Sequence, residues 1–247
     1  MTENRVALVT GSSSGIGAAI AARLAAEGMR LVINSSRSPE KGRELAAELP
    51  DAHYVQADVS DEADAVRLVD AVIERYGRLD VLVNSAGVTQ VIPHADIAAV
   101  TPEVWQRILG VNVIGTWQVI QAAAPHLAKA ESGAGSVVTI SSVAGNRPVG
   151  SSIPYAVSKA ALDHMTRLLA AALGPHIRVN SVAPALTETP WTRDNPFFQK
   201  IAEKVREETP LRRVGTDADV AEAVLAAVRN PHMTGAVIPV DGGAALI

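Results

Sequence analysis

A tyrosine and a lysine four residues apart are the side chains of this sequence that could most directly move a proton. Tyr155 and Lys159 would lie one turn apart on the same face of a helix, and Pro154 suits the first turn of that helix. A free phenol has a pKa of about 10 and is a poor base at neutral pH. A neighbouring ammonium favours the phenolate, so the pair could serve in acid–base catalysis. The same spacing also fits a half-buried tyrosine beside a surface lysine.

A glycine-rich turn near the start of the chain has the form of a phosphate-binding loop. A β-branched run, residues 6–10, leads directly into Gly11-Ser12-Ser13-Ser14-Gly15-Ile16-Gly17 and then into a helical segment. Glycines let backbone amides approach a pyrophosphate, and the helix N-terminus adds partial positive charge. A tight turn without a ligand would use similar residues, but the strand before it and the helix after it favour a dinucleotide site.

The elements that must position these residues alternate along the chain. Apolar runs without alternation predict strands buried on both faces, at residues 6–10, 31–34, 81–84, 137–141, 177–182 and 237–240. Alanine-rich segments with helical periodicity lie between them, at residues 17–27, 39–48, 62–76, 102–129, 154–173 and 218–229. This α/β alternation predicts a single domain over residues 1–247, a Rossmann-like, doubly wound parallel sheet of about seven strands with helices on both faces. The long irregular stretch 185–213 is predicted to be a substrate lid.

The turn TGSSSGIG, residues 10–17, resembles the TGxxxGIG fingerprint of the short-chain dehydrogenase/reductase family, and later motifs follow in the same order along the chain. The resemblance implies an NAD(P)-dependent oxidoreductase that acts on CH–OH and C=O groups. It also implies cofactor contacts in the turn from Gly11, Ser13, Ser14, Gly15, Ile16 and Gly17.

The residues after the second strand bear on the choice of cofactor. An acidic residue at this place would bind the ribose 2′-hydroxyl of NAD, but the sequence has Ser35, Ser36 and Arg37 and no acid until Glu40. Serines and an arginine can donate to a 2′-phosphate, so NADP(H) is favoured and NAD(H) stays possible. Arg37 could instead be a solvated loop cation.

Two further strand ends resemble family segments around the adenine and its ribose. Asp58 and Val59 look like the adenine-contacting pair, although Asp58 could equally cap the next helix. Residues 84–87 resemble the NNAG segment, which implies cofactor contacts from Asn84, Ala86 and Gly87, with Ser85 replacing the second asparagine.

The resemblance also supplies the partners of Tyr155 and Lys159. Ser142 lies thirteen residues before Tyr155, the spacing of the serine that holds the substrate oxygen, and Ser141 is its rival by chemistry. Asn112 matches the asparagine that supports proton relay from within a helix. The predicted catalytic set is therefore Ser142, Tyr155, Lys159 and Asn112, with Tyr155 and Lys159 also contacting the cofactor. Without the resemblance, Asn112 would be a packing or hydrogen-bonding amide.

Residues downstream are expected to border the nicotinamide and the substrate. Residues 182–189 resemble the PGxxxT segment, which implies cofactor contacts from Pro184, Thr187 and Thr189, with Ala185 where glycine is usual. Trp191 and Phe197, with Phe198, are expected to line the substrate pocket beside Ser142 and Tyr155. They could also form a small core of the loop itself.

The composition excludes several other classes of function. The net charge is −4, with basic residues scattered along the chain, so neither nucleic acid nor an anionic membrane is expected as a partner. There is no cysteine, and the histidines lack ligand spacing, so we expect no metal site. No segment has the pattern of a signal peptide or a membrane span, which predicts a cytoplasmic protein.

The most direct interpretation is an NADP(H)-preferring oxidoreductase that interconverts a carbonyl and a secondary alcohol, with a small-molecule substrate. Alternatives are specifically a 3-oxoacyl-[acyl-carrier-protein] reductase, which the generic motifs also resemble, or a non-catalytic NADP(H)-binding regulator. The intact set of Ser142, Tyr155, Lys159 and Asn112 argues against the regulator. By resemblance to the family, we expect a homotetramer or dimer formed through the segments 102–129 and 154–173.

Overall fold

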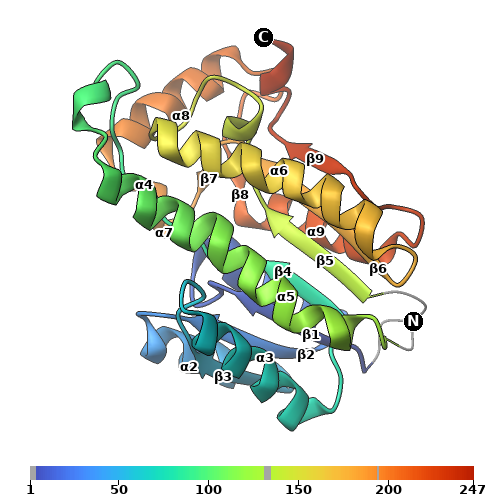
Figure 1. Cartoon of the computed structure of the whole chain (residues 1–247). Coiled ribbons are helices and arrows are strands. Elements are labelled where there is room, and N and C mark those ends of the chain that lie inside the picture. Colours follow the sequence, from blue (N-terminus) through green and yellow to red (C-terminus); the bar gives the residue numbers. More distant parts are fainter. Residues whose placement is uncertain (1–3, 131–134, 194) are drawn as a thin grey trace.

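The computed structural model describes residues 4–130, 135–193 and 195–247, apart from the side chain of Trp191 (Figure 1). Its main sheet has seven parallel strands in the order β3-β2-β1-β4-β5-β6-β9. Their bounds are β1 Val6–Thr10, β2 Arg30–Ser35, β3 Ala52–Gln56, β4 Val81–Asn84, β5 Gly135–Ile140, β6 Ile177–Pro184 and β9 Val237–Val240. The predicted doubly wound sheet is confirmed.

Helices cover both faces of this sheet, as predicted. In Figure 1, α3 (Glu62–Tyr76), α5 (Thr116–Leu127) and α6 (Ile153–Leu173) lie across the near face. On the other face α1 (Gly15–Ala25), α2 (Pro39–Glu48) and α9 (Asp217–Arg229) pack against the strands. The central strands β1 and β4 are buried throughout, which explains their unbroken runs of apolar residues.

The strand order reverses between β1 and β4, where the chain leaves one half of the sheet for the other. In an open parallel sheet, this switch point opens a crevice at the carboxyl ends of the strands. The glycine-rich turn after β1 and the residues after β4 and β5 therefore meet at one edge of the sheet.

The apolar runs of the sequence do not include β3, although the resemblance placed Asp58 and Val59 after a strand. Ala52 and Tyr54 are partly buried, Val55 is buried, and the other two residues are exposed, because among the described strands β3 pairs with β2 alone. An edge strand is covered on fewer sides than a central strand, so its sequence does not show the continuous apolar run of the central strands.

The single helix expected over residues 102–129 is wrong in detail. The segment begins as α4 (Pro102–Leu109), widens into a π-helical turn over Gly110–Gly115, and continues as α5. Gly115 packs against the loop that follows β3. A Cβ atom added to Gly115 would lie 2.9 Å from the Val59 carbonyl oxygen. π-Helical turns of this kind are frequent at functional sites.

The expectation of an irregular stretch over residues 185–213 is also wrong. This segment contains β7 (Thr187–Glu188), the short helix α7 (Pro190–Arg193) and the longer α8 (Pro196–Glu208), and β7 pairs with β8 (Gly215–Thr216). The Asn195 side chain caps α8 by accepting from the Phe197 amide, and Pro196 occupies the first turn. No residue of α8 is buried and nearly half of its residues are charged, so α8 lacks the apolar content of the core helices.

The remaining short elements are η1 (Ile97–Ala99), η3 (Val143–Gly145) and η4 (Ala244–Leu246). Within the described part of the chain, no helix is long and apolar enough to cross a membrane. The predicted cytoplasmic location stays a prediction.

Candidate active site

The glycine-rich turn lies at the carboxyl end of β1 and forms one wall of a cleft of about 430 Å³. Gly11 and Gly15 have φ angles of +62° and +55°, a region that favours glycine. A Cβ atom on Gly11 would lie 2.6 Å from the Ala86 Cα atom, and one on Gly17 would lie 2.4 Å from the Gly11 carbonyl oxygen. These close approaches leave the backbone of the turn open to the cleft.

The start of α1 faces the same cleft. Ser14, the N-cap of α1, makes no side-chain capping bond, so the first amides of this helix are not used by that side chain. Ser14 and Ile16 line the cleft, whereas Ser13 is partly exposed outside its lining. Backbone amides at a helix N-terminus suit an anionic group such as a pyrophosphate.

The residues after β2 lie apart from this cleft lining. Ser35 is buried, and its Oγ lies 2.9 Å from the Tyr54 Oη, which also donates to the Ser35 carbonyl oxygen. Ser36 is partly buried, and Arg37 is exposed and makes no hydrogen bond or ion pair within the described ranges. Sequence reasoning missed Tyr54, although a tyrosine on the neighbouring strand is the signal that could have found it.

Hydrogen bonds decide whether Asp58 caps the next helix or is free to contact adenine. Asp61, not Asp58, is the N-cap of α3, since its side chain accepts from the Asp64 amide. The Asp58 carboxylate accepts from the amide and hydroxyl of Ser60, and its residue is exposed. Val59 is buried against Gly115. The helix-cap alternative is therefore wrong, and contact of Asp58 with adenine stays a prediction.

The segment after β4 contains a buried amide whose polar atoms have no partner. Asn84 is 3% exposed, and within the described structure neither its Nδ2 nor its Oδ1 makes a hydrogen bond. The amides of Ser85 and Ala86 both donate to the Thr10 hydroxyl, which fixes this segment against the glycine-rich turn. Buried amides without partners are costly, so Asn84 is a position where a ligand or water would supply bonds.

The predicted catalytic side chains meet on the opposite wall of the cleft. Ser142 follows β5, and its hydroxyl hydrogen-bonds the phenol of Tyr155 and accepts from the Ala144 amide. Tyr155 comes from the first turn of α6, with Lys159 one turn later. The Lys159 Nζ lies 5.5 Å from the centroid of the Tyr155 ring and donates to the Ile140 carbonyl oxygen at 2.8 Å.

Burial shifts the pKa values of both ionisable groups toward their neutral forms. Desolvation raises the pKa of Tyr155 to about 12, although the hydrogen bond from Ser142 acts to lower it. Desolvation also lowers the pKa of Lys159 to about 8, against the attraction of Asp163. Desolvation therefore exceeds the effect of the Ser142 hydrogen bond, and the phenol of Tyr155 is neutral at physiological pH. The lowering of this pKa by Lys159 and a bound nicotinamide stays a prediction.

Asn112 is fully buried in the π-helical turn and does not line the cleft. Its Oδ1 accepts from the Val88 amide, and its Nδ2 donates to the Val88 carbonyl and to the Ser158 hydroxyl. Ser158 in turn donates to the Tyr155 carbonyl oxygen. The side chain thus connects the segment after β4 to the first turn of α6. A Cβ atom on the intervening Gly87 would lie 3.5 Å from Asn112 Oδ1 and 3.8 Å from Lys159 Nζ.

A buried carboxylate behind the lysine was not predicted. Asp163 is 5% exposed, one turn after Lys159 on α6, and its Oδ1 accepts from the Ser181 hydroxyl. The Ser181 hydroxyl also lies within hydrogen-bond distance of Ser141, the rival of Ser142, and the Ser141 hydroxyl hydrogen-bonds Asp163. Ser141 therefore belongs to a buried network at the wall of the cleft. Asp163 follows Lys159 by four residues, as Lys159 follows Tyr155, and this spacing could have indicated that all three lie on one face of the helix.

The far end of the cleft is formed by the segment after β6 and by α8. Pro184, Thr187 and Thr189 line it, and so do Phe197 and Phe198, whose rings pack edge to face with centroids 5.1 Å apart. The structure therefore brings Phe197 to the cleft together with Ser142 and Tyr155. The expected role of the Trp191 side chain lies outside the described residues.

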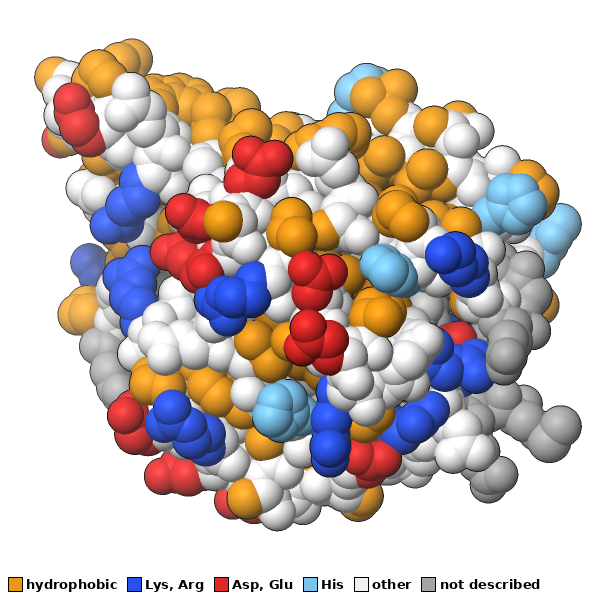
Figure 2. All heavy atoms as spheres, turned by 60° about the horizontal axis from the view of Figure 1, so that its bottom comes forward, with side chains coloured by type: hydrophobic (Ala, Val, Ile, Leu, Met, Phe, Trp, Pro, Cys, Tyr) orange, Lys and Arg blue, Asp and Glu red, His pale blue; other side chains and the backbone are white. Residues whose placement is uncertain are grey.

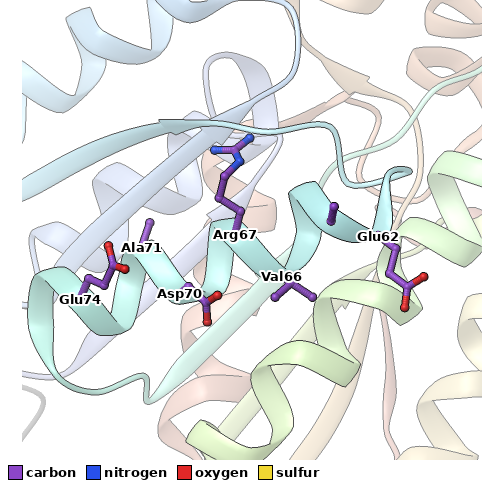
Figure 3. A pocket seen from close by; sticks show the side chains of 7 residues that line it. Glu62, Val66, Arg67, Asp70, Ala71 and Glu74 are labelled. Carbon is purple, nitrogen blue, oxygen red and sulfur yellow. The ribbon is translucent and has the colours of Figure 1, made fainter.

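A second hollow on the described surface lacks the chemistry of this cleft. A hollow on α3 is lined by side chains of that helix alone, with Glu62, Asp70 and Glu74 along it (Figure 3). On the face shown in Figure 2, Lys and Arg are interspersed with Asp and Glu. Among the described residues, no three histidine, aspartate or glutamate side chains are grouped to hold a metal ion.

Comparison with known proteins gives consistent similarities over the whole chain. The family model described as enoyl-(acyl carrier protein) reductase matches residues 11–245. The "granaticin polyketide synthase putative ketoacyl reductase 2" of Streptomyces violaceoruber is 65% identical over 245 residues, 99% of this chain and 98% of that protein. A 3-oxoacyl-[acyl-carrier-protein] reductase of Thermotoga maritima is 38% identical, covering 98% of each chain.

Comparison with solved structures gives similarities of the same kind. A "putative short-chain dehydrogenase/reductase" from Burkholderia xenovorans has a TM-score of 0.89 and 36% identity and covers 99% of each chain. A 3-ketoacyl-(acyl-carrier-protein) reductase from Brucella melitensis, solved in complex with NADH, has a TM-score of 0.89 and 32% identity. It covers 98% of this chain and 99% of its own.

Proposed function

The chain belongs to the short-chain dehydrogenase/reductase family, whose members bind NAD(P)(H), and is an oxidoreductase. From that premise we propose that it interconverts a carbonyl and a secondary alcohol with NADP(H), using Tyr155 as general acid and base. One observation carries the proposal: Ser142, Tyr155 and Lys159 line the same cleft as the glycine-rich turn. A cofactor held by the turn and a carbonyl held by Ser142 and Tyr155 would therefore share one space.

The residues of the cleft fit a dinucleotide. Gly11 and Gly17 have no room for a Cβ atom, and the bare backbone at these positions allows a pyrophosphate to approach the turn and the N-terminus of α1. The partnerless amide of Asn84 offers a donor and an acceptor at the next strand end. Asp58, Val59, Ala86 and Gly87 would complete the adenosine side, and Pro184, Thr187 and Thr189 the nicotinamide side.

The chemistry assigns a distinct task to each side chain. The nicotinamide, when bound, supplies or accepts the hydride. Ser142 donates a hydrogen bond to the carbonyl oxygen, and Tyr155, neutral because its pKa is about 12, gives its proton to that oxygen during reduction. Two donors aimed at one oxygen stabilise the charge that develops on it. In oxidation Tyr155 must accept the proton, and the Lys159 ammonium favours the phenolate that this requires.

Lys159 and Asn112 support this exchange in different ways. Lys159 is held at the floor of the cleft by the Ile140 carbonyl, where its ammonium can orient a ribose and return protons to Tyr155. Asn112 makes no contact with the cleft and holds the segment after β4 against α6. Asn112 would therefore support proton resupply indirectly, by holding α6 in position.

A preference for NADP(H) follows from the residues after β2. Ser36 and the exposed, unpaired Arg37 can donate to a 2′-phosphate, and no acidic side chain stands at Ser35 to repel one. NAD(H) remains the alternative cofactor, since a structural relative was solved with NADH.

A 3-oxoacyl-[acyl-carrier-protein] reductase is the more specific candidate, favoured by relatives that carry that name. Recognition of an acidic carrier protein would use basic residues near the cleft. Arg147, however, donates to carbonyl oxygens of Ala244 and Ile247, and Arg213 is paired with Asp219. Arg212 donates to the Glu207 carbonyl oxygen, so all three arginines are already engaged within the chain.

Assembly into a homotetramer or dimer is part of the proposal. The expected helices expose large apolar side chains, namely Ile114, Trp117, Val157 and Leu168, whose relative exposures are 40% or more. Light scattering at micromolar concentration should give a mass of two or four chains. A monomer would contradict this assembly.

The function is tested by cofactor titration together with turnover. NADPH and NADH are titrated by fluorescence, and a panel of ketones, diketones and 3-oxoacyl thioesters is then followed at the NADPH absorbance. We expect tighter binding of NADPH and its oxidation by at least one panel member. Tight binding without any turnover would favour the non-catalytic regulator, and tighter binding of NADH would contradict the cofactor preference.

A further inference from the structure

The end of the cleft beyond the catalytic pair has a consistent chemical character. Its walls come from the η3 segment after β5, from the segment after β6 and from α8. Their apolar side chains are Val143, Val149, Leu186, Phe197, Phe198 and Ile201. Lys159 is the one charged side chain among the described residues that line the cleft, and it lies at the floor beside Tyr155.

The hydroxyl groups of this end are largely committed to the protein. The Ser151 hydroxyl is hydrogen-bonded to Thr89, and the Thr192 hydroxyl donates to the Thr187 carbonyl oxygen at 2.7 Å. The Thr187 hydroxyl donates to the Ala185 carbonyl oxygen. These donors are used to hold the segment in place, so little donor capacity is left for polar substituents of a ligand.

From this lining we infer that the substrate is an uncharged ketone, or the matching alcohol, whose carbonyl bears an apolar ring that packs against Phe197, Phe198 and Ile201. The inference rests on the proposed function, because it takes Ser142 and Tyr155 to hold the reacting oxygen. A carboxylate or phosphate on the ring would be buried without a partner, which is strongly unfavourable. The edge-to-face pair of phenyl rings offers faces and edges to an aromatic or alicyclic ring.

The size of the cleft agrees with a compact ring. Its volume of about 430 Å³ must hold the nicotinamide end of the cofactor as well as the reacting part of the substrate. This volume lies toward the lower end of the range of about 300–1,000 Å³ that is usual for ligand pockets. A longer substrate would extend past Val149, which is 40% exposed at the mouth.

A matched pair of ketones tests the inference. Methyl 4-acetylbenzoate and 4-acetylbenzoate have the same ring and the same reacting carbonyl and differ in charge at the far end. Their binding is measured on the full-length Tyr155→Phe protein loaded with NADPH, by quenching of cofactor fluorescence, and their turnover is measured on the unmodified protein. We expect the ester to bind at least about 100-fold more tightly, because the cleft offers the carboxylate no partner.

A charge placed in the wall sharpens the test. Ile201→Lys on the surface helix α8 should strengthen binding of 4-acetylbenzoate at least about tenfold and leave the ester unimproved, since the ammonium would pair with the buried carboxylate. Gln199→Lys adds the same charge to α8 outside the cleft lining and should change neither affinity. Equal binding of the two ketones, tighter binding of the carboxylate, or equal effects of the two lysines would overturn the inference. A clear preference for the ester without turnover would contradict the proposed function alone.

Discussion

The two ends of the cleft are built in different ways. At the nucleotide end the backbone itself forms the surface, and Gly11 and Gly17 are required because a Cβ atom at either would collide with neighbouring backbone atoms. At the substrate end the surface consists of side chains from the η3 segment, from the segment after β6 and from α8, a helix without a buried residue. The first end is fixed by the sheet, whereas the second can change its side chains at little cost to the fold. Such a division lets one cofactor site serve many substrates.

The largest expected effect lies at the junction of the two ends. Tyr155→Phe removes the proton-transferring hydroxyl and keeps the ring, so kcat should fall by roughly 100- to 10,000-fold, the usual contribution of general acid–base catalysis. The dissociation constant of NADPH should change less than about twofold, because the hydroxyl is not needed to hold the pyrophosphate. Steady-state kinetics and fluorescence titration measure the two quantities. Retained turnover would mean that another group moves the proton.

At the nucleotide end, the cofactor preference should reverse with one charge. Ser35→Asp places a carboxylate where a 2′-phosphate would lie, and the ratio of NADPH to NADH affinity should fall by about 10- to 100-fold through repulsion of like charges. Ser35→Asn is the uncharged control of the same shape. If both variants lower the ratio equally, loss of the hydroxyl rather than charge sets the preference.

The crowded backbone of the turn predicts a smaller but selective effect. Gly17→Ala would place a Cβ atom 2.4 Å from the Gly11 carbonyl oxygen, and overpacking of this kind costs about 1–3 kcal/mol. NADPH affinity should weaken by about tenfold, which corresponds to roughly 1.4 kcal/mol. Gly110→Ala, where no atom lies within 4 Å of the added Cβ, is the matched control and should bind NADPH normally. Similar weakening in both would show that the turn is not specially constrained.

The smallest effect concerns pH. The folded protein releases the Lys159 proton at about pH 8, below the ordinary value of 10.5, so between these values the unfolded chain holds more protons and stability rises with pH. Asp163 raises the pKa of Lys159, and Asp163→Asn should therefore lower it further. The alkaline limb of NADPH-dependent reduction should then move to lower pH. Asp70→Asn on α3 is the exposed control, and an unmoved limb in Asp163→Asn would exclude coupling between the two α6 residues.

The sequence predicted the nucleotide end better than the substrate end. Gly11, Gly15 and Gly17 are demanded by backbone geometry, and Tyr155 and Lys159 by helical spacing, so their placement could be anticipated. The buried central strands were equally clear, because they are apolar on both faces. The structure therefore agrees with the sequence wherever one geometry permits few residue types.

The failures have a common physical cause. α8 was missed because nearly half of its residues are charged and none is buried, and the apolar runs did not include β3 because an edge strand is half covered. The raised pKa of Tyr155 depends on how much protein surrounds the phenol, which no local pattern records. Asp163 and Tyr54 act through contacts with residues far along the chain, so only the assembled sheet shows them.

The most direct test of the account is to follow the hydride itself. The protein is incubated with NADPH deuterated at nicotinamide C4 on one face at a time and with a neutral ketone such as methyl 4-acetylbenzoate, and the alcohol is analysed by mass spectrometry and NMR. The account predicts deuterium on the carbinol carbon from one face of the nicotinamide only. An alcohol without deuterium from either face, or no alcohol from any ketone of the panel while NADPH binds tightly, would contradict it.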